Sequence, residues 1–107
     1  MYELRNFITT NGKDVFDEWL EGLTDLRAHA AIMARLDRLE SGAFGDVKSI
    51  ESGVRELRID VGAGYRVYFT QRGKTIFLLL CGGDKSSQSR DIKLALKYLK
   101  EFDQRTS

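Results

Sequence analysis

The spacing of apolar residues in the first part of the chain changes from alternating to helical. Residues 2–9 alternate between apolar and polar positions, which predicts a short strand. A helix capped by Asn11 is expected next, because apolar side chains then recur at helical spacing: Val15, Phe16, Trp19, Leu20 and Leu23. A second helix is expected between a capping Thr24 and a terminating Gly42, with a buried stripe of Ala28, Ile32, Leu36 and Leu39. The short connection between the two helices predicts a helical hairpin.

From residue 54 onward, apolar side chains recur at every second position. The preceding residues 42–53 are polar and flanked by glycine, and we interpret them as a loop. Strands are predicted at 54–60, 65–72 and 76–81. The last of these is apolar on both faces, which is typical of a central strand, and Gly82-Gly83 is expected to end it. A final helix is expected after a capping Ser86, Ser87 or Ser89.

This order of elements predicts an α+β sandwich. It comprises an N-terminal strand, a helical hairpin, a three-stranded antiparallel meander and a C-terminal helix, with the helices mainly on one face of the sheet. The apolar positions of the first two meander strands share a face only if the turn around Gly62 and Gly64 holds an odd number of residues or a bulge. The expected core beneath the sheet comprises Leu57, Phe69, Leu80, Ile92 and Leu96.

Composition limits the class of protein. The 107 residues have the size of one domain, 1–107, and 42% apolar with 31% charged residues is typical of a folded globular chain. The single cysteine, Cys81, excludes an intrachain disulfide, and the single histidine, His29, excludes a multi-histidine metal site. No apolar run approaches membrane-spanning length, and the first residues lack the pattern of a signal peptide. A cytoplasmic protein is expected.

Charge is distributed unevenly along the chain. Residues 1–53 hold six Lys/Arg against ten Asp/Glu, a net charge of −4, whereas residues 54–107 hold eleven against six, a net charge of +5. Such asymmetry favours a second half that faces a polyanion. The alternative is a solvated surface that is merely polarised, and a pI of about 7.8 is below the range typical of nucleic-acid-binding domains.

A group of basic side chains is the one constellation with possible chemistry, because the chain lacks a Ser-His-Asp set, a Walker loop and a dinucleotide motif. Arg58 and Arg66 are expected to project from neighbouring strands, on the face of the sheet opposite the one that carries Leu57 and Phe69. Tyr68 is expected nearby on the same face. Lys85 and Arg90 follow the central strand. Guanidinium groups bind phosphate, and a tyrosine ring can stack on a base. The alternative is that Glu56 and Asp60 pair these arginines in an ordinary surface network.

The sequence around these residues resembles the RelE/ParE toxin superfamily, and in particular its HigB-like branch of addiction-module killer proteins. The resemblance is carried by GVRELRID at 53–60, GYRVYF at 64–69, LLLCGGDKSSQ at 78–88, and Asp91-Ile92. It implies the toxin of a type II toxin–antitoxin pair. RelE- and HigB-like members cut mRNA in the ribosomal A site without a metal, whereas ParE-like members inhibit DNA gyrase.

The resemblance also implies roles for individual residues. Arg66 matches the arginine that contacts the scissile phosphate, and Arg58 and Lys85 match further basic positions of the catalytic site. Lys48 matches a basic position used on RNA, and with Arg55, Tyr68 and Arg90 it makes up the expected RNA-binding residues. The chain departs from the RelE pattern at Glu56, which replaces a lysine, and it has no clear counterpart of the late catalytic tyrosine.

The expected partners are a cognate antitoxin of the helix-turn-helix type, the ribosome and mRNA, with no cofactor, metal or membrane. A gyrase inhibitor and a non-toxic binding module on the same fold are the alternatives. The basic face of the sheet favours the endonuclease, whereas Glu56 favours the other two.

Overall fold

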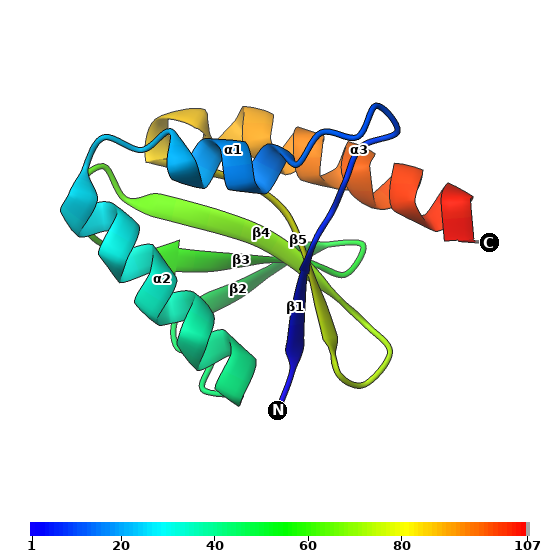
Figure 1. The fold of residues 1–107 in the computed structure, drawn as a ribbon, viewed down its shortest axis with the longest axis horizontal. Helices are drawn as coiled ribbons and strands as arrows, with labels where there is room; N and C mark the ends of the chain where they lie inside the picture. The colour runs from blue at the N-terminus through cyan, green and yellow to red at the C-terminus, as the bar shows by residue number, and fades with distance from the viewer. Residues whose placement is uncertain (107) are drawn as a thin grey trace.

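The computed structural model describes residues 1–106, in which a five-stranded sheet carries three α-helices (Figure 1). The strands pair in the order β1-β5-β4-β3-β2, with β1 parallel to β5 and all other neighbours antiparallel. The predicted α+β class and the antiparallel meander β3-β4-β5 are confirmed. The elements are β1 (Glu3–Asn6), α1 (Val15–Glu21), α2 (Leu26–Ser41), β2 (Val47–Glu51), β3 (Val54–Ile59), β4 (Tyr65–Arg72), β5 (Ile76–Asp84), the 3₁₀ helix η1 (Lys85–Ser87) and α3 (Gln88–Thr106).

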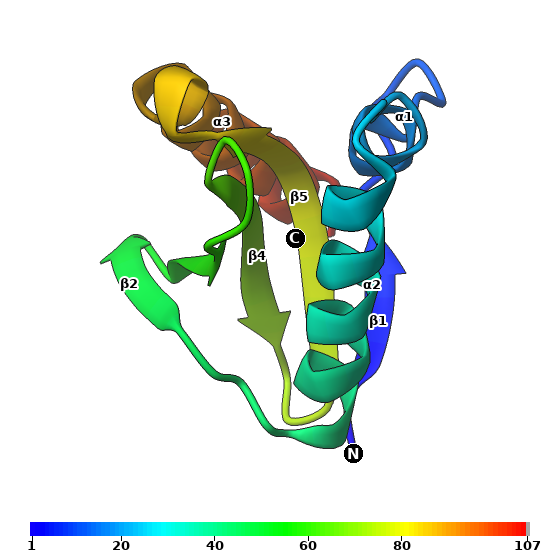
Figure 2. The same cartoon turned by 90° about the vertical axis from the view of Figure 1, so that its left-hand side faces the viewer.

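Helices cover both faces of the sheet (Figure 2). On the first face, α1 and α2 pack over Phe77 and Leu79 of β5, and on the second face α3 packs over Leu78 and Leu80. The expectation that the helices lie mainly on one face holds for α1 and α2 but not for α3, the longest of the three. Because β5 is apolar on both faces, each of its faces needs a covering layer.

The sheet divides the core into two clusters, one on each face, and the pairing of β4 with β5 shifts register along its length. Tyr68 pairs with Cys81 but Phe69 pairs with Leu79, so Leu80 is an extra residue and packs in the same second-face cluster as Cys81. The expected strand register of Leu57 and Phe69 is confirmed, and residues 60–64, an odd number, connect β3 to β4. The expected single core is wrong. Leu57 and Phe69 lie in the first-face cluster, whereas Leu80, Ile92 and Leu96 belong to the second.

The segment interpreted as a loop contains an edge strand, β2, which pairs with β3. Its two apolar residues serve opposite faces, since Val47 packs against the first-face cluster and Ile50 against the second. The strand therefore lacks the alternation that marks the others, and its register shifts between Ser49 and Glu51.

The first two helices begin later than expected. Asp14 caps α1 by accepting a hydrogen bond from Asp17 N, and Asp25 caps α2 by accepting from Arg27 N and Ala28 N, so Asn11 and Thr24 are not the caps. Gly42 ends α2 in the left-handed conformation, as predicted. The helical hairpin is wrong: α1 and α2 lie crosswise on the first face instead of side by side (Figures 1 and 2).

Two glycines expected to end β5 instead lie within it and allow close packing on both faces. Gly82 pairs with Val67 and Gly83 pairs with Arg66. A Cβ at Gly82 would lie 2.3 Å from Cε3 of Trp19 on α1, and a Cβ at Gly83 would lie 1.7 Å from Oδ2 of Asp91 on α3. Both helices therefore approach the strand backbone directly.

We expect Gly82→Ala to lower the free energy of unfolding by about 1–3 kcal/mol, because the added methyl group overlaps the Trp19 ring. Urea unfolding of the variant measures the loss. The double variant Gly82→Ala/Trp19→Leu is expected to recover part of it, since the smaller side chain leaves room. Equal losses in the single and double variants would contradict the steric explanation.

Candidate functional site

Two arginines face each other across the second face of the sheet. Arg58 on β3 is the direct cross-strand partner of Arg66 on β4, and Glu56 lies two residues before Arg58 on the same face. Like charges directly opposite each other in a sheet are destabilising. The pair is therefore maintained only if a counter-charge lies within reach, and Glu56 provides it.

The Glu56 carboxylate is fully buried and bound on both oxygens. Oε1 accepts a hydrogen bond of 2.9 Å from Arg58 Nε and lies 3.8 Å from Arg66 Nε. Oε2 accepts hydrogen bonds from Tyr68 Oη at 2.9 Å and from Gln88 Nε2 at 2.8 Å. Glu56 thus joins β3, β4 and the first residue of α3, hydrogen-bonds the guanidinium of Arg58 and places its negative charge beside the guanidinium of Arg66.

The electrostatics follow from this arrangement. Burial alone raises the pKa of Glu56, but hydrogen bonds from Gln88, Arg58 and Tyr68, together with the charge of Arg58, lower it below its ordinary value. Burial and the hydrogen bond to Glu56 raise the pKa of Tyr68 far above its ordinary value. Glu56 is therefore ionised and Tyr68 is neutral at physiological pH.

Arg66 retains binding capacity despite its burial. Its side chain is 9% exposed, and Nη1 donates a hydrogen bond of 3.0 Å to its neighbour's carbonyl, Tyr65 O. Within residues 1–106, Arg66 Nε has no hydrogen-bond partner. A buried guanidinium with an unused donor is suited to an incoming anion.

Arg58 and Arg66 line a small surface hollow of about 180 Å³ near the start of η1. Lys85 contributes a third cation, and its aliphatic part crosses Gly64, where a Cβ would lie 2.9 Å from Lys85 Cε. Asp46 and Asp60 complete the lining. The charges at the hollow are thus mixed, with three cations and two acids in its lining and the Glu56 carboxylate beside the arginines.

One further arginine supports the rim from the first face. Arg35 on α2 donates hydrogen bonds to the carbonyls of Arg58, Phe44 (3.1 Å) and Asp46 (3.4 Å). The segment before β2 is thereby held against the end of β3, which places Asp46 beside Arg58. Neither Arg35 nor Gln88 was expected at the site. Gln88 lies within the LLLCGGDKSSQ motif, and that position is the signal that could have indicated it.

The structure brings together only some of the predicted site residues. Arg58, Arg66 and Lys85 meet at the hollow. Lys48 is the cross-strand partner of Glu56, so it lies on the same face of the sheet, and its side chain is exposed. Arg55 was predicted to bind RNA with this group, but it lies on the first face, with its guanidinium 6.0 Å from the centre of the Phe69 ring.

Two other residues predicted to bind RNA do not line the hollow. Tyr68 is fully buried, and its hydroxyl is bound to Glu56, so its ring is not available to stack on a base. Arg90 is exposed on α3 and lies 3.8 Å from Asp91 Oδ1, outside the lining of the hollow. Of the alternative network, in which Glu56 and Asp60 pair the arginines at the surface, only the Glu56 part is present, and its carboxylate is buried. Within residues 1–106, Asp60 lines the hollow but forms no ion pair with either arginine.

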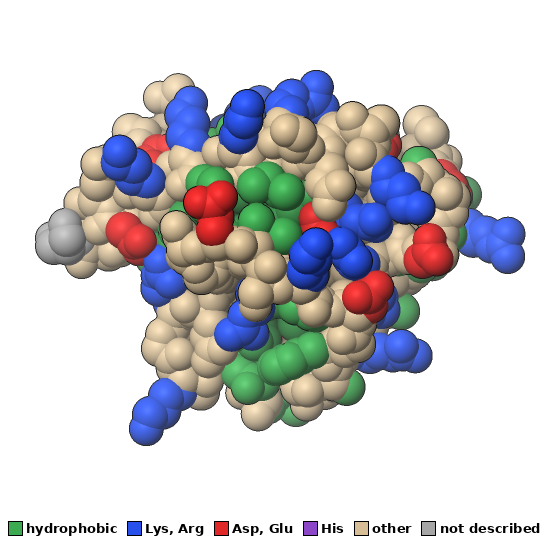
Figure 3. Space-filling view, turned by 180° about the vertical axis from the view of Figure 1, so that it is seen from behind, with side chains coloured by type: hydrophobic (Ala, Val, Ile, Leu, Met, Phe, Trp, Pro, Cys, Tyr) green, Lys and Arg blue, Asp and Glu red, His purple; other side chains and the backbone are tan. Residues whose placement is uncertain are grey.

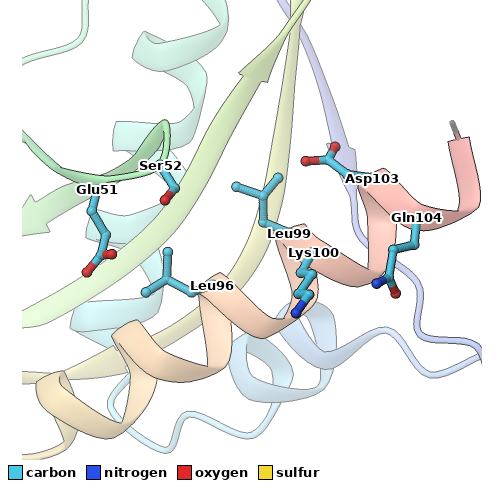
Figure 4. A pocket seen from close by; sticks show the side chains of 7 residues that line it. All are labelled: Glu51, Ser52, Leu96, Leu99, Lys100, Asp103 and Gln104. Carbon is cyan, nitrogen blue, oxygen red and sulfur yellow. The ribbon is translucent and has the colours of Figure 1, made fainter.

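A larger hollow, about 550 Å³, lies elsewhere, between the β2–β3 turn and α3 (Figure 4). Leu96 and Leu99 rise from α3 toward Glu51 and Ser52 (Figure 4). This groove therefore has an apolar floor, unlike the polar hollow at Arg58 and Arg66.

Other chemistry finds little support in the described part of the chain. Burial, followed by the charge of Asp91, raises the pKa of the Cys81 thiol to about 12, so this cysteine is not a nucleophile at neutral pH. Residues 1–106 contain no group of three or more His, Cys, Asp or Glu side chains placed to hold a metal ion. No helix in the same range is both long and apolar enough to cross a membrane.

Comparison with known proteins identifies the family. The sequence profile of the family described as phage derived protein Gp49-like (DUF891) matches residues 18–105. The chain belongs to this family. The Gp49-like family is toxin-like and of the addiction-module type, and the match includes every residue that lines the hollow, as well as Glu56 and Gln88.

A similar protein is known from Haemophilus influenzae. This Gp49-like protein is 56% identical to an uncharacterized protein of that organism over 87 residues, which cover 81% of this chain and 88% of the relative.

Proposed function

We propose that this Gp49-like protein is the toxin of a type II toxin–antitoxin system and acts as a ribosome-dependent mRNA endonuclease of the HigB-like, RelE/ParE type. The observation that carries the proposal is the Arg58–Arg66 pair, which buried Glu56 orients beside a hollow that also holds Lys85. The resemblance of the surrounding motifs to RelE- and HigB-like toxins supports the same reading. The proposed partners are mRNA on the ribosome and a helix-turn-helix antitoxin, and the proposed place of action is the cytoplasm.

The proposed reaction is attack of an RNA 2′-oxygen on the adjacent phosphorus. A new P–O bond forms, the bond to the leaving 5′-oxygen breaks, and a proton passes from the 2′-hydroxyl to the 5′-oxygen through general base and acid groups. Arg66 and Arg58 are suited to stabilise the extra negative charge on the pentavalent phosphate. Lys85 and exposed Lys48 are the candidates for proton transfer, while the ribosome positions the mRNA. Tyr68 takes no part, since its hydroxyl is bound to Glu56.

The alternative candidate is a gyrase inhibitor that works by binding alone. The observation that favours it is the charge balance at the hollow, where Asp46, Asp60 and Glu56 offset much of the charge of the three cations. For catalysis, the RNA phosphate has to compete with these acids for the three cations. Binding of a protein partner does not require such competition.

Expression without a partner is expected to arrest growth and to produce new mRNA 5′ ends within translated regions. Primer extension on cellular mRNA detects these ends. The double variant Arg58→Ala/Arg66→Ala should produce neither effect, whereas Lys74→Ala, which removes one exposed charge from the β4–β5 turn, should behave as the parent protein.

Two results would contradict the endonuclease. Normal growth with folded protein present would exclude toxicity, and growth arrest with intact mRNA would exclude cleavage. In the second case, a supercoiling assay with purified gyrase tests the alternative.

A further inference from the structure

The solvent-facing side of α3 carries a row of cations that the hollow does not use. Arg90, Lys93, Lys97 and Lys100 recur at intervals of three and four residues and are all exposed. At 3.6 residues per turn they lie within roughly 80° of arc and extend over about 15 Å of the helix. Figure 3 shows Lys and Arg side chains gathered along the upper part of the second face, where α3 runs. We refer to these four residues as the α3 basic row.

The acidic residues of α3 are all engaged by other parts of the molecule. Asp91 is buried and accepts a hydrogen bond from Ser87 Oγ. Glu101 accepts from Thr10 N at 2.9 Å, and Asp103 receives two hydrogen bonds from Arg72 Nη2, at 2.9 and 3.0 Å. Charge on the helix is therefore sorted, with each acid bound by a neighbouring element and the cations left toward solvent.

The row is largely free of counter-charge. Within residues 1–106, the three lysines form no ion pair, although the charge of Lys97 is a minor cause of the lowered pKa of Glu101, and Arg90 forms an ion pair only with Asp91, at 3.8 Å. Exposed lysines at one spacing along a helix repel one another, and a polyanion that releases its counterions on binding relieves this repulsion. The row begins at the η1 end of the helix. There the charge of Arg90, after hydrogen bonds from Ser86 and Ser87, helps to lower the pKa of Asp84. The row therefore starts close to Lys85 and the hollow.

The surroundings of the row favour a nucleic acid over a membrane. A helix that lies in a lipid interface needs exposed apolar side chains beside its cations. The apolar side of α3 is instead packed on the sheet, and the large apolar side chains that are exposed in residues 1–106 are Met1, Ile8, Leu26 and Met33, none of them on this helix. A double-helical RNA presents phosphates and 2′-hydroxyls to such a surface without requiring base contacts.

We propose that the α3 basic row binds the backbone of double-helical RNA, while the hollow at Arg58 and Arg66 receives a single-stranded segment. The choice of RNA rests on the proposed function, which it deepens by assigning a second, sequence-independent surface that holds the toxin on structured RNA of the ribosome. The row makes charge contacts only and takes no part in bond cleavage.

The test measures binding of a 20-base-pair RNA duplex by fluorescence anisotropy at several salt concentrations. The triple variant Lys93→Gln/Lys97→Gln/Lys100→Gln should bind at least about tenfold more weakly at low salt, and the slope of log K against log[salt] should fall in magnitude by about 2–3, since each phosphate contact contributes about 0.9. The matched control Arg27→Gln/Arg38→Gln/Lys74→Gln removes the same charge from exposed positions on α2 and the β4–β5 turn. It should retain most of the parental slope. Circular dichroism checks that both variants are folded.

Three results would overturn the proposal. Equal losses in the two triple variants would show that net charge alone matters. Absence of duplex binding by the parent protein would exclude the surface as an RNA site. Co-sedimentation of the parent protein with anionic phosphatidylserine vesicles at salt concentrations where duplex binding is lost would favour a membrane. Duplex binding does not require cleavage, so the two proposals can fail separately. Equal salt slopes in the parent protein and the α3 triple variant would reject this inference alone. A protein that binds duplex through the α3 basic row but leaves mRNA intact would reject only the endonuclease.

Discussion

Replacement of Arg66 by alanine is expected to lower the rate of ribosome-dependent mRNA cleavage by about 10²–10³-fold, which is typical for loss of one donor to a developing negative charge. Arg66 is the best-placed residue for this role because β4 holds its side chain in the lining of the hollow, and its buried Nε has no hydrogen-bond partner within residues 1–106. Cleavage of a defined mRNA by purified protein on ribosomes measures the change. Arg66→Lys should recover only a small part, since an ammonium group lacks the forked geometry of a guanidinium.

The competing explanation is that Arg66 only supports Glu56. It predicts that Arg66→Ala and Glu56→Gln lose stability in parallel, while the folded fraction of each cleaves mRNA normally. Thermal melting and cleavage measured side by side separate the two explanations. A stable and fully active Arg66→Ala protein would remove this residue from the site.

Replacement of Glu56 by alanine is expected to lower the free energy of unfolding by about 3–5 kcal/mol, the range for removal of one partner from a buried ion pair. The change leaves Arg58 and Arg66 opposite each other without a counter-charge, and it removes the acceptor of the Tyr68 hydroxyl and the Gln88 amide. Urea unfolding at neutral pH measures the loss. Glu56→Gln keeps the shape and one acceptor oxygen and should lose less. Equal stability of the alanine variant and the parent protein would show that the carboxylate does not hold the pair.

The same carboxylate makes stability depend on pH in a defined direction. Because the pKa of folded Glu56 is lowered, its contribution is fully present above the unfolded value of about 4.5 and is lost as pH falls through the folded value. The difference in stability between the parent protein and Glu56→Gln should therefore be constant near neutral pH and shrink below about pH 4.5. A difference that does not change with acid would contradict the assignment.

Alternation and helical spacing correctly predicted the helices and strands whose apolar residues pack on a single face of the sheet. The stripe of α2 and the register of β3 and β4 are examples, since a one-residue slip would expose Leu57 and Phe69. Spacing failed for β2, whose Val47 and Ile50 serve opposite faces. It also could not choose between neighbouring cap residues, because Asn, Asp and Thr all accept from free amides at a helix start.

The site was predictable as far as direct alternation reaches. Arg58 and Arg66 lie on the same face of the sheet because each directly adjoins, in sequence, a first-face core residue, Leu57 or Val67. Arg55 was assigned by resemblance, although its spacing from Leu57 already placed it on the opposite face. The burial of Tyr68 depends on α3 crossing the second face, which is a tertiary contact that no local pattern encodes.

The parallel pairing of β1 with β5 also protects the chain against aggregation. β5 is the strand most thoroughly apolar on both faces, and an open edge on such a strand is a template for pairing with another molecule. β1 covers that edge with only four residues, and its own outer positions Glu3 and Arg5 are exposed and charged. Since β1 is synthesised first and β5 much later, the cover is already present when the vulnerable strand leaves the ribosome. The finished sheet therefore ends in a short, charged edge strand, and the long apolar edge of β5 is not exposed to other molecules.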